Sequence, residues 1–264
     1  MAPRLRPYVL PTVLWGSVIA AALAVRPPLP VDETRYLAVA WDMWREGHFL
    51  VPHLNGDTYS HKPPLLFWLI CAGWKLFGVG DWWPRMVAPL FGLGCLFLTR
   101  RLAAVLWPDR PRAFDTAPVL LFGCVFWAVF TTLTMFDMIL AFFALAALIA
   151  LVMAARTGRW RGFVAAGLAV GLGVLAKGPA VLLHILPVAL AAPWWLPRLA
   201  GRDPDAAWTW GRWYAGVLLT VGIGAAVGLA WALPAATAGG PAYRAAIFWG
   251  QSAGRMVDSF AHAK

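Results

Sequence analysis

The chain has 264 residues, a formal net charge of +10 at pH 7 and 61% hydrophobic residues, with a mean hydropathy of +0.68. This composition excludes an ordinary soluble domain and predicts an all-α, polytopic membrane protein. The positive charge does not predict a nucleic-acid partner. The basic residues lie mainly in short loops between apolar runs, where they orient a membrane protein and contact anionic membrane lipids.

We expect about seven transmembrane helices in this chain and two juxtamembrane helices in its first external loop. The parts in chain order are a first span, that external loop, six further spans and the start of a second external loop, at residues 8–25, 26–84, 85–233 and 234–264. The six further apolar runs cover roughly residues 87–98, 117–131, 138–155, 163–176, 180–196 and 214–233. We favour an uncleaved first span over a secretory signal, because many spans follow it.

The external loop contains the two juxtamembrane helices. Residues 32–46 alternate apolar and charged side chains at helical spacing, which is typical of a helix on the membrane surface. Residues 65–79 are apolar but short for a span. If they did cross the bilayer, the Arg-rich loops near residues 100–112, 156–161 and 198–212 would face outward, against the positive-inside rule. The charge pattern therefore places residues 26–84 outside the cytoplasmic membrane.

The first cluster of polar residues begins where the first span ends. Asp32, Arg35 and Tyr36 are spaced i, i+3 and i+4, so they share one face of a helix. Asp32 and its neighbour Glu33 are candidates for a general base or a metal ligand. The alternative is an acidic pair that only stabilises the start of the helix. Function is favoured, because carboxylates at the mouth of a span are costly to desolvate.

Three further charges lie near span ends. Lys62 precedes two prolines at a helix start, where an ammonium and the helix dipole would attract a phosphate; a snorkelling lysine is the alternative. Asp137 precedes an unbroken apolar run and should face a cavity or a partner, although an N-cap is the alternative. Lys177 interrupts apolar sequence at a Gly-Pro turn, which favours a polar contact over a simple turn.

Six motifs occur in order along the chain: Asp-Glu-x-Arg-Tyr (32–36), Pro-His-Leu-Asn-Gly (52–56), Tyr-x-x-Lys-Pro-Pro-Leu (59–65), Leu-Phe-Gly (76–78), Asp-Met (137–138) and Leu-x-Lys-Gly-Pro (175–179). This set resembles the membrane glycosyltransferases of the dolichyl-phosphate-mannose–protein mannosyltransferase superfamily. It is most similar to the bacterial branch, which includes the lipid A aminoarabinose transferases. The resemblance extends over essentially the whole chain.

The resemblance implies a GT-C glycosyltransferase fold and an enzyme of the bacterial inner membrane, with an active site that faces the periplasm. Its donor would be a sugar, a hexose or a pentose, on a polyprenyl phosphate. Its acceptor would be a lipid or protein hydroxyl, as in lipid A modification or protein glycosylation. By motif, Asp32 matches the catalytic acid, with Glu33 beside it, and Asp137 the second acid. Residues expected at the substrate are Tyr59, Lys62, Arg35, Tyr36, Lys177 and Arg255.

We expect transfer with inversion and no required cofactor. A divalent cation is left open, with Asp32 and Asp137 as its ligands. Two departures from the family pattern stand out: His61 occupies the position before Lys-Pro-Pro where an acid is common, and family members are usually much longer. The chain is therefore expected to be the N-terminal part of a longer transmembrane domain. The alternative functions are a transporter or flippase of polyprenyl-linked lipids and a non-catalytic membrane scaffold.

Overall fold

The computed structural model describes residues 6–199 and 208–250, and most of that part of the chain is helical. The α-helices are α1 (Arg6–Val25), α2 (Asp32–Glu46), α3 (Leu65–Phe77), α4 (Trp82–Leu106), α5 (Pro111–Phe122), α6 (Val125–Phe130), α7 (Asp137–Thr157), α8 (Arg161–Lys177), α9 (Ala180–Leu190), α10 (Ala192–Trp195), α11 (Trp210–Ala238) and α12 (Gly240–Ala245). Strands β1 (His53–Leu54) and β2 (Asp57–Thr58) form an antiparallel hairpin. A 3-10 turn covers Leu196–Arg198, and a π-helical turn covers Ala246–Gly250.

Among the described residues, four helices are long and apolar enough to cross a membrane, and α9 with α10 makes a fifth candidate that is bent by 48°. The all-α membrane fold is thus confirmed, but the structure supports fewer spans than the expected seven. The apolar run at 117–131 is broken between α5 and α6 at Gly123 and Cys124. Helix α8 has 17 residues, about 25 Å at 1.5 Å per residue, so whether it spans the bilayer stays a prediction.

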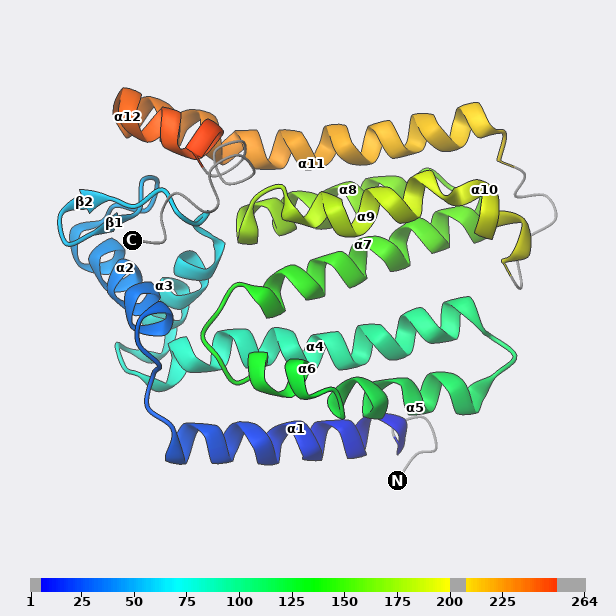
Figure 1. Cartoon of the computed structure of the whole chain (residues 1–264), viewed down its shortest axis with the longest axis horizontal. Helices are drawn as coiled ribbons and strands as arrows, with labels where there is room; N and C mark the ends of the chain where they lie inside the picture. The colour runs from blue at the N-terminus through cyan, green and yellow to red at the C-terminus, as the bar shows by residue number, and fades with distance from the viewer. Residues whose placement is uncertain (1–5, 200–207, 251–264) are drawn as a thin grey trace, which may run out of the picture.

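The long helices lie side by side, and the chain runs back and forth between two ends of the bundle (Figure 1). One end, here the hairpin end, carries α2, α3, the β-hairpin, the start of α7 and the end of α8. The other end, here the loop end, carries the α4–α5 and α7–α8 connections and α10. Because backbone groups in lipid must be satisfied within each helix, the irregular and polar segments gather at these two ends.

Helices α8 and α11 approach closely because each presents glycine to the other. A Cβ atom on Gly167 or Gly171 of α8 would lie 2.7 or 2.5 Å from a side-chain carbon of Ile223 or Val227 on α11. Small residues allow such contacts between membrane helices, where van der Waals packing replaces the hydrophobic drive of water. This packing fixes α8 and therefore the position of Lys177 at its end.

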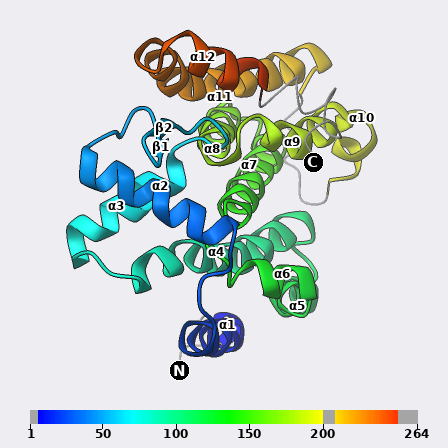
Figure 2. The same cartoon turned by 60° about the vertical axis from the view of Figure 1, so that its left-hand side comes forward.

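Helices α2 and α3 form a layer across the hairpin end (Figure 2). The apolar face of α2 packs on α3, with Val39 and Met43 of α2 and Phe67 and Ile70 of α3 all fully buried in one cluster. Helix α3 has 13 residues, about 20 Å, which is too short for the hydrocarbon core of about 30 Å. The structure thus contains the two short helices that the sequence predicts between the first span and α4. That they lie at the membrane surface stays a prediction.

Candidate active site

A cavity of about 250 Å³ opens at the hairpin end, between α2, the segment after β2, the start of α7 and the end of α8. Its wall combines charged, aromatic and apolar side chains from all four segments. The lining residues are Asp32, Arg35, Tyr36, Tyr59, His61, Lys62, Met135, Phe136, Asp137 and Lys177. The structure therefore brings seven of the nine predicted site residues into one cavity, although the longest separation between them exceeds half the chain.

Helix α2 contributes Asp32, Arg35 and Tyr36 from its first turns. Arg35 forms an ion pair with Asp32, and the Tyr36 hydroxyl lies 3.4 Å from the same Asp32 oxygen. The Tyr36 ring is buried, and it packs edge-on against Phe136 with 4.9 Å between ring centroids. Burial raises the pKa of Tyr36, and the negative charge of Asp32 raises it further. Tyr36 therefore remains a protonated hydrogen-bond donor at neutral pH.

Asp137 and Lys177 come from different helices and form an ion pair in the cavity wall. Asp137 begins α7, Lys177 ends α8, and the Lys177 ammonium donates a 2.6 Å hydrogen bond to the Asp137 carboxylate. The two side chains are 31% and 30% exposed, so water or a ligand can reach both. Asp137 therefore lines a cavity and also has a charged partner, as its position directly before an apolar run predicts.

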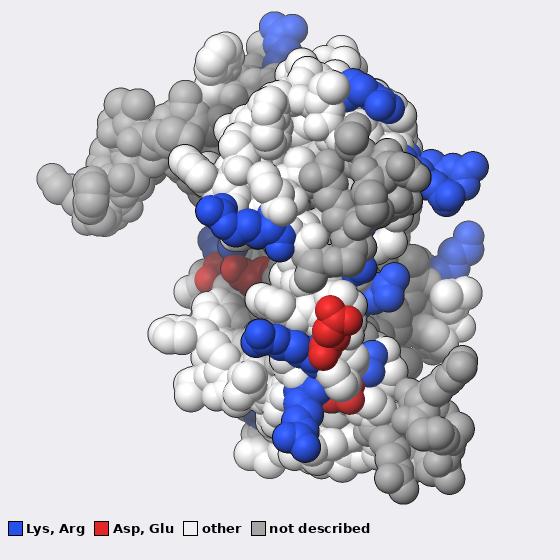
Figure 3. Space-filling view, turned by 90° about the vertical axis from the view of Figure 1, so that its right-hand side faces the viewer, with Lys and Arg blue, Asp and Glu red and all other residues white. Residues whose placement is uncertain are grey.

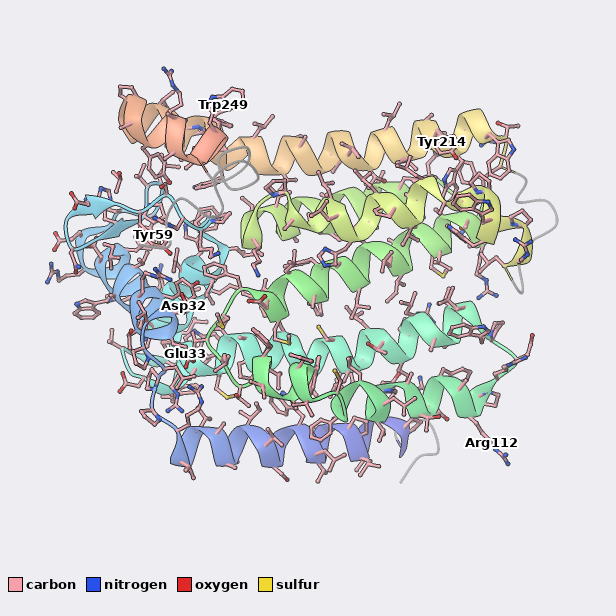
Figure 4. The ribbon with its side chains drawn as sticks, in the orientation of Figure 1. Asp32, Glu33, Tyr59, Arg112, Tyr214 and Trp249 are labelled. Carbon is pink, nitrogen blue, oxygen red and sulfur yellow. The ribbon has the colours of Figure 1, made fainter. Side chains whose placement is uncertain are left out.

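The β-hairpin positions the third part of the site. Its turn residues Asn55 and Gly56 have φ of 56° and 90°, values that asparagine and glycine adopt more readily than other residues. The Tyr59 backbone N–H donates to the carbonyl of Pro52 at 2.7 Å, which turns the chain back toward the cavity. The Tyr59 ring is 4% exposed and stacks on His61 at 5.4 Å. Figure 4 shows Tyr59 and Asp32 at the same end of the bundle.

The charges of the cavity suit an anion. Arg35, Lys62 and Lys177 are cationic, while Asp32 and Asp137 are the acids in its wall. Three cationic and two acidic side chains leave the wall with one more positive than negative charge. Each acid forms an ion pair with one of the cations. A phosphate group could accept hydrogen bonds from these cations, and charge-assisted bonds are stronger than neutral ones. A hydroxyl group bound in the same cavity would lie close to a carboxylate that could accept its proton.

Glu33 lies outside the cavity wall, contrary to its grouping with the catalytic acids. Its side chain is 1% exposed, and its carboxylate is bound by the Arg26 guanidinium and by the backbone N–H groups of Leu29 at 2.7 Å and Thr134 at 2.6 Å. Burial would raise the pKa of Glu33, but the hydrogen bonds from Arg26, Thr134 and Leu29 outweigh it, so the pKa is lowered. Glu33 thus fastens the α1–α2 connection to the α6–α7 segment.

The remaining predicted residue, Arg255, lies outside the described residues. The cavity also contains His61, Met135 and Phe136, which the sequence analysis did not assign to the site. His61 had a signal, since it occupies a position where the family often has an acid. For Phe136 the indication from the sequence is weaker, namely its position directly before Asp137.

The divalent cation that the sequence analysis left open, with Asp32 and Asp137 as ligands, stays untested. Within residues 6–199 and 208–250, neither Asp32 nor Asp137 belongs to a group of three or more metal-ligating side chains. Such a group does occur outside the cavity, where Asp42, His48 and His53 place their ligand atoms within 4.8 Å of one another. These three residues were not predicted from the sequence, because only the fold brings His53 of the hairpin close to Asp42 of α2.

Known proteins resemble this chain in sequence and in fold. A model of the dolichyl-phosphate-mannose-protein mannosyltransferase family matches residues 61–202, just over half of the chain. Two similar curated proteins are undecaprenyl phosphate-alpha-4-amino-4-deoxy-L-arabinose arabinosyl transferases. The one from Pseudomonas savastanoi pv. phaseolicola is 28% identical over 94% of this chain. The one from Pseudomonas fluorescens is 30% identical over 98% of it.

The chain spans about half the length of these curated relatives, since it covers 46% of each. Among solved structures, ArnT from Cupriavidus metallidurans bound to undecaprenyl phosphate has a TM-score of 0.74 and 24% identity, over 92% of this chain and 44% of ArnT. The apo form of the same protein has a TM-score of 0.70. At this identity, the likeness shows a shared fold.

Proposed function

Because this chain belongs to the dolichyl-phosphate-mannose-protein mannosyltransferase family, we propose that it is the site-bearing part of a membrane glycosyltransferase. The enzyme transfers a sugar from a polyprenyl-phosphate donor to a hydroxyl group. One observation carries this proposal: Arg35, Lys62 and Lys177 share a single cavity with Asp32 and Asp137 at the end of an apolar bundle. Such a cavity pairs anion-binding cations with a candidate base.

In this mechanism, the cations act mainly on the leaving phosphate. The phosphate gains negative charge as the glycosidic bond breaks, so Lys62 and Arg35 bind it more strongly in the transition state than in the ground state. Tyr59 lines the same wall and supports this binding. Asp32 accepts the proton of the acceptor hydroxyl as that oxygen attacks the anomeric carbon. Attack from the face opposite the phosphate inverts the configuration.

Asp137 has a supporting part in this scheme. Its hydrogen bond to Lys177 fixes the ammonium at the cavity wall, 2.6 Å from the carboxylate. A fixed cation stabilises developing charge without the cost of reorganisation during the reaction. Asp137 also offsets one positive charge before the donor binds.

For the substrate class, the names of the relatives favour an amino-pentose on undecaprenyl phosphate as donor. A lipid hydroxyl is then the acceptor that we propose, in preference to a protein hydroxyl. The described cavity of about 250 Å³ is smaller than the roughly 300–1,000 Å³ that is usual for drug-sized ligands. It would therefore hold the sugar phosphate head group alone, and the polyprenyl chain would lie in the membrane.

The distribution of charge supports a site that faces the periplasm. Figure 3 views the molecule from the loop end, where blue Lys and Arg side chains outnumber red acidic ones. The described charged residues of this end are Arg100, Arg101, Arg110, Arg112, Arg156, Arg159, Arg161, Arg198 and Arg212 against Asp109 and Asp115. The hairpin end has nearly balanced described charges: Arg26, Arg35, Arg45, Lys62, Lys75, Arg85, Lys177 and Arg244 against Asp32, Glu33, Asp42, Glu46, Asp57, Asp81 and Asp137. Under the positive-inside rule, the loop end is cytoplasmic.

Orientation is tested by cysteine accessibility in intact cells. A cysteine at Asn55 of the hairpin should react with an impermeant thiol reagent, and one at Asp109 of the loop end should react only after the membrane is opened. Native Cys124 is exposed and is first replaced with serine. Labelling with the opposite sidedness would overturn the proposed orientation.

Activity is tested in membranes from cells that produce the protein, with a radiolabelled undecaprenyl-phosphate amino-pentose as donor. The expected result is a labelled lipid product whose sugar is resistant to the mild acid that cleaves the donor. A flippase would move the donor across the bilayer and form no new glycosidic bond. A scaffold would do neither, so either outcome rejects the transferase.

A further inference from the structure

We propose that Asp42, His48 and His53 form a binding site for a divalent metal ion of the zinc class, separate from the cavity that contains Asp32. Asp42 lies ten residues after Asp32 on the same helix, about 15 Å along its axis. His48 follows the end of α2, and His53 begins the β-hairpin. The inference rests on three features of these side chains.

The first feature is the spacing of the ligand atoms. His48 Nδ1 lies 3.6 Å from the Asp42 Oδ1 atom, which is too long for a hydrogen bond. Two ligands that bind one zinc ion at about 2.0–2.1 Å with tetrahedral angles lie about 3.4 Å apart. All three ligand atoms of the cluster lie within 4.8 Å of one another. A small movement of the side chains would therefore complete three of the four corners around an ion.

The second feature is a buried carboxylate oxygen without a hydrogen bond. The Asp42 side chain is 15% exposed. Its Oδ1 atom is inaccessible and has no hydrogen-bond partner among the described residues. A buried charge without partners is unfavourable, and such groups are normally paired or bound to metals. Because this oxygen is the one nearest to His48, a cation between the two would satisfy it.

The third feature is the hydrogen bond that orients His53. Its Nδ1 atom lies 2.8 Å from the carbonyl oxygen of Val51. A carbonyl can only accept, so Nδ1 carries the proton and Nε2 of the neutral ring keeps its lone pair. Metal-bound histidines commonly make this second hydrogen bond, which fixes both tautomer and ring orientation. The His48 and His53 rings lie close together, with 4.3 Å between their centroids.

The ligand types select the metal. Two imidazoles and one carboxylate suit zinc and similar ions, whereas magnesium and calcium prefer oxygen ligands only. The fourth position is open to water, because His48 is an exposed residue. The ion would join the end of α2 to the β-hairpin, which leads to Tyr59 and Lys62. Its proposed role is therefore to hold the hairpin in place, with no part in the transfer step.

Zinc binding is measured on full-length, detergent-purified protein produced with an affinity tag that lacks histidine. The protein is stripped with a chelator and dialysed against buffered Zn²⁺, and bound zinc is counted by elemental analysis. One ion per chain is expected, and millimolar Mg²⁺ should not displace it. Asp42→Asn, His48→Gln and His53→Gln should each weaken binding by at least about tenfold, the lower limit for a lost ligand-orienting contact. His184→Gln, at an exposed histidine of α9, is the matched control and should bind normally.

A second measurement does not depend on the variants or on sugar transfer. Addition of Zn²⁺ to the stripped wild-type protein should slow proteolysis within residues 48–58, because the ion fixes the hairpin to α2. The proposal is overturned if the wild type retains no zinc, if all three variants retain it as tightly as His184→Gln, or if zinc leaves the hairpin equally sensitive. If a variant fails to fold, the wild-type protection experiment decides.

Discussion

Replacement of Glu33 by glutamine tests whether this acid stabilises the fold or takes part in chemistry. The substitution keeps the size of the side chain and removes its charge. The Arg26 guanidinium then loses its anionic partner. Because the amide group of glutamine has only one oxygen, Leu29 and Thr134 also compete for a single acceptor, where each now donates to its own carboxylate oxygen.

The size of the effect follows from burial. Removal of one partner of a buried ion pair costs about 3–5 kcal/mol. Glu33 is 1% exposed, but the Arg26 side chain is 21% exposed and also donates to the Thr132 carbonyl at 2.6 Å. Arg26 is thus not left wholly unsatisfied, and we expect the lower limit, a loss of about 3 kcal/mol in the free energy of unfolding.

The assay is unfolding of the purified protein by SDS in mixed micelles, followed by tryptophan fluorescence. Glu46→Gln is the matched control, because Glu46 lies on the same helix but is 45% exposed and pairs with its neighbour Arg45 on the surface. Its expected effect is within about 0.5 kcal/mol. If Glu33→Gln and Glu46→Gln unfold alike, the structural assignment of Glu33 is wrong.

The same pair of proteins gives a pH test of known sign. Because the folded state lowers the pKa of Glu33, the carboxylate stabilises the fold at pH values above its ordinary pKa of about 4.3. That contribution is lost as the pH falls below about 4.3 and through the lowered folded pKa. The difference between wild type and Glu33→Gln should therefore be constant near neutrality and shrink in acid. A difference that grows in acid would contradict the reasoning.

Three further predictions concern the cavity and use protein with measured transfer activity. Asp32→Asn should lower single-turnover transfer by about 10²–10⁴-fold with unchanged donor affinity, and near-normal turnover would remove Asp32 as the base. Lys62→Met should weaken donor binding by about 1.5–3 kcal/mol and also slow transfer; if neither changes, Lys62 is a snorkelling surface residue. In a double-mutant cycle for donor binding, Asp137→Asn and Lys177→Met should show a coupling energy of about 0.5–3 kcal/mol, whereas strict additivity would mean that their 2.6 Å contact has no role in binding.

Much of the candidate site could be predicted from the sequence, because the rules involved are local. The spacing of Asp32, Arg35 and Tyr36 fixes a shared helix face. The bilayer adds a second constraint, since Asp137 and Lys177 each interrupt apolar sequence and must lie near a membrane boundary. These two constraints predict a common end of the bundle, and the structure adds that the side chains line one cavity.

Other features depend on contacts that no local pattern encodes. Glu33 is adjacent to Asp32, but successive residues of a helix point about 100° apart, and only the tertiary fold brings Thr134, 101 residues later, to its carboxylate. The broken α5–α6 segment was wrongly expected as one continuous run. Asp42 and His53 become neighbours only when the hairpin folds back beside α2.

The pairing of Asp137 with Lys177 has a consequence for biosynthesis. Asp137 stands at the head of the apolar helix α7, and its partner follows 40 residues later at the end of α8. A nascent chain that released α7 into lipid alone would leave this acid without its ammonium at the membrane boundary. The short α7–α8 connection instead allows both helices to leave the translocation machinery as one hairpin, with the two charges arriving together. The partition of α7 from the translocon into the bilayer should then depend on α8, although α7 is the more hydrophobic of the two.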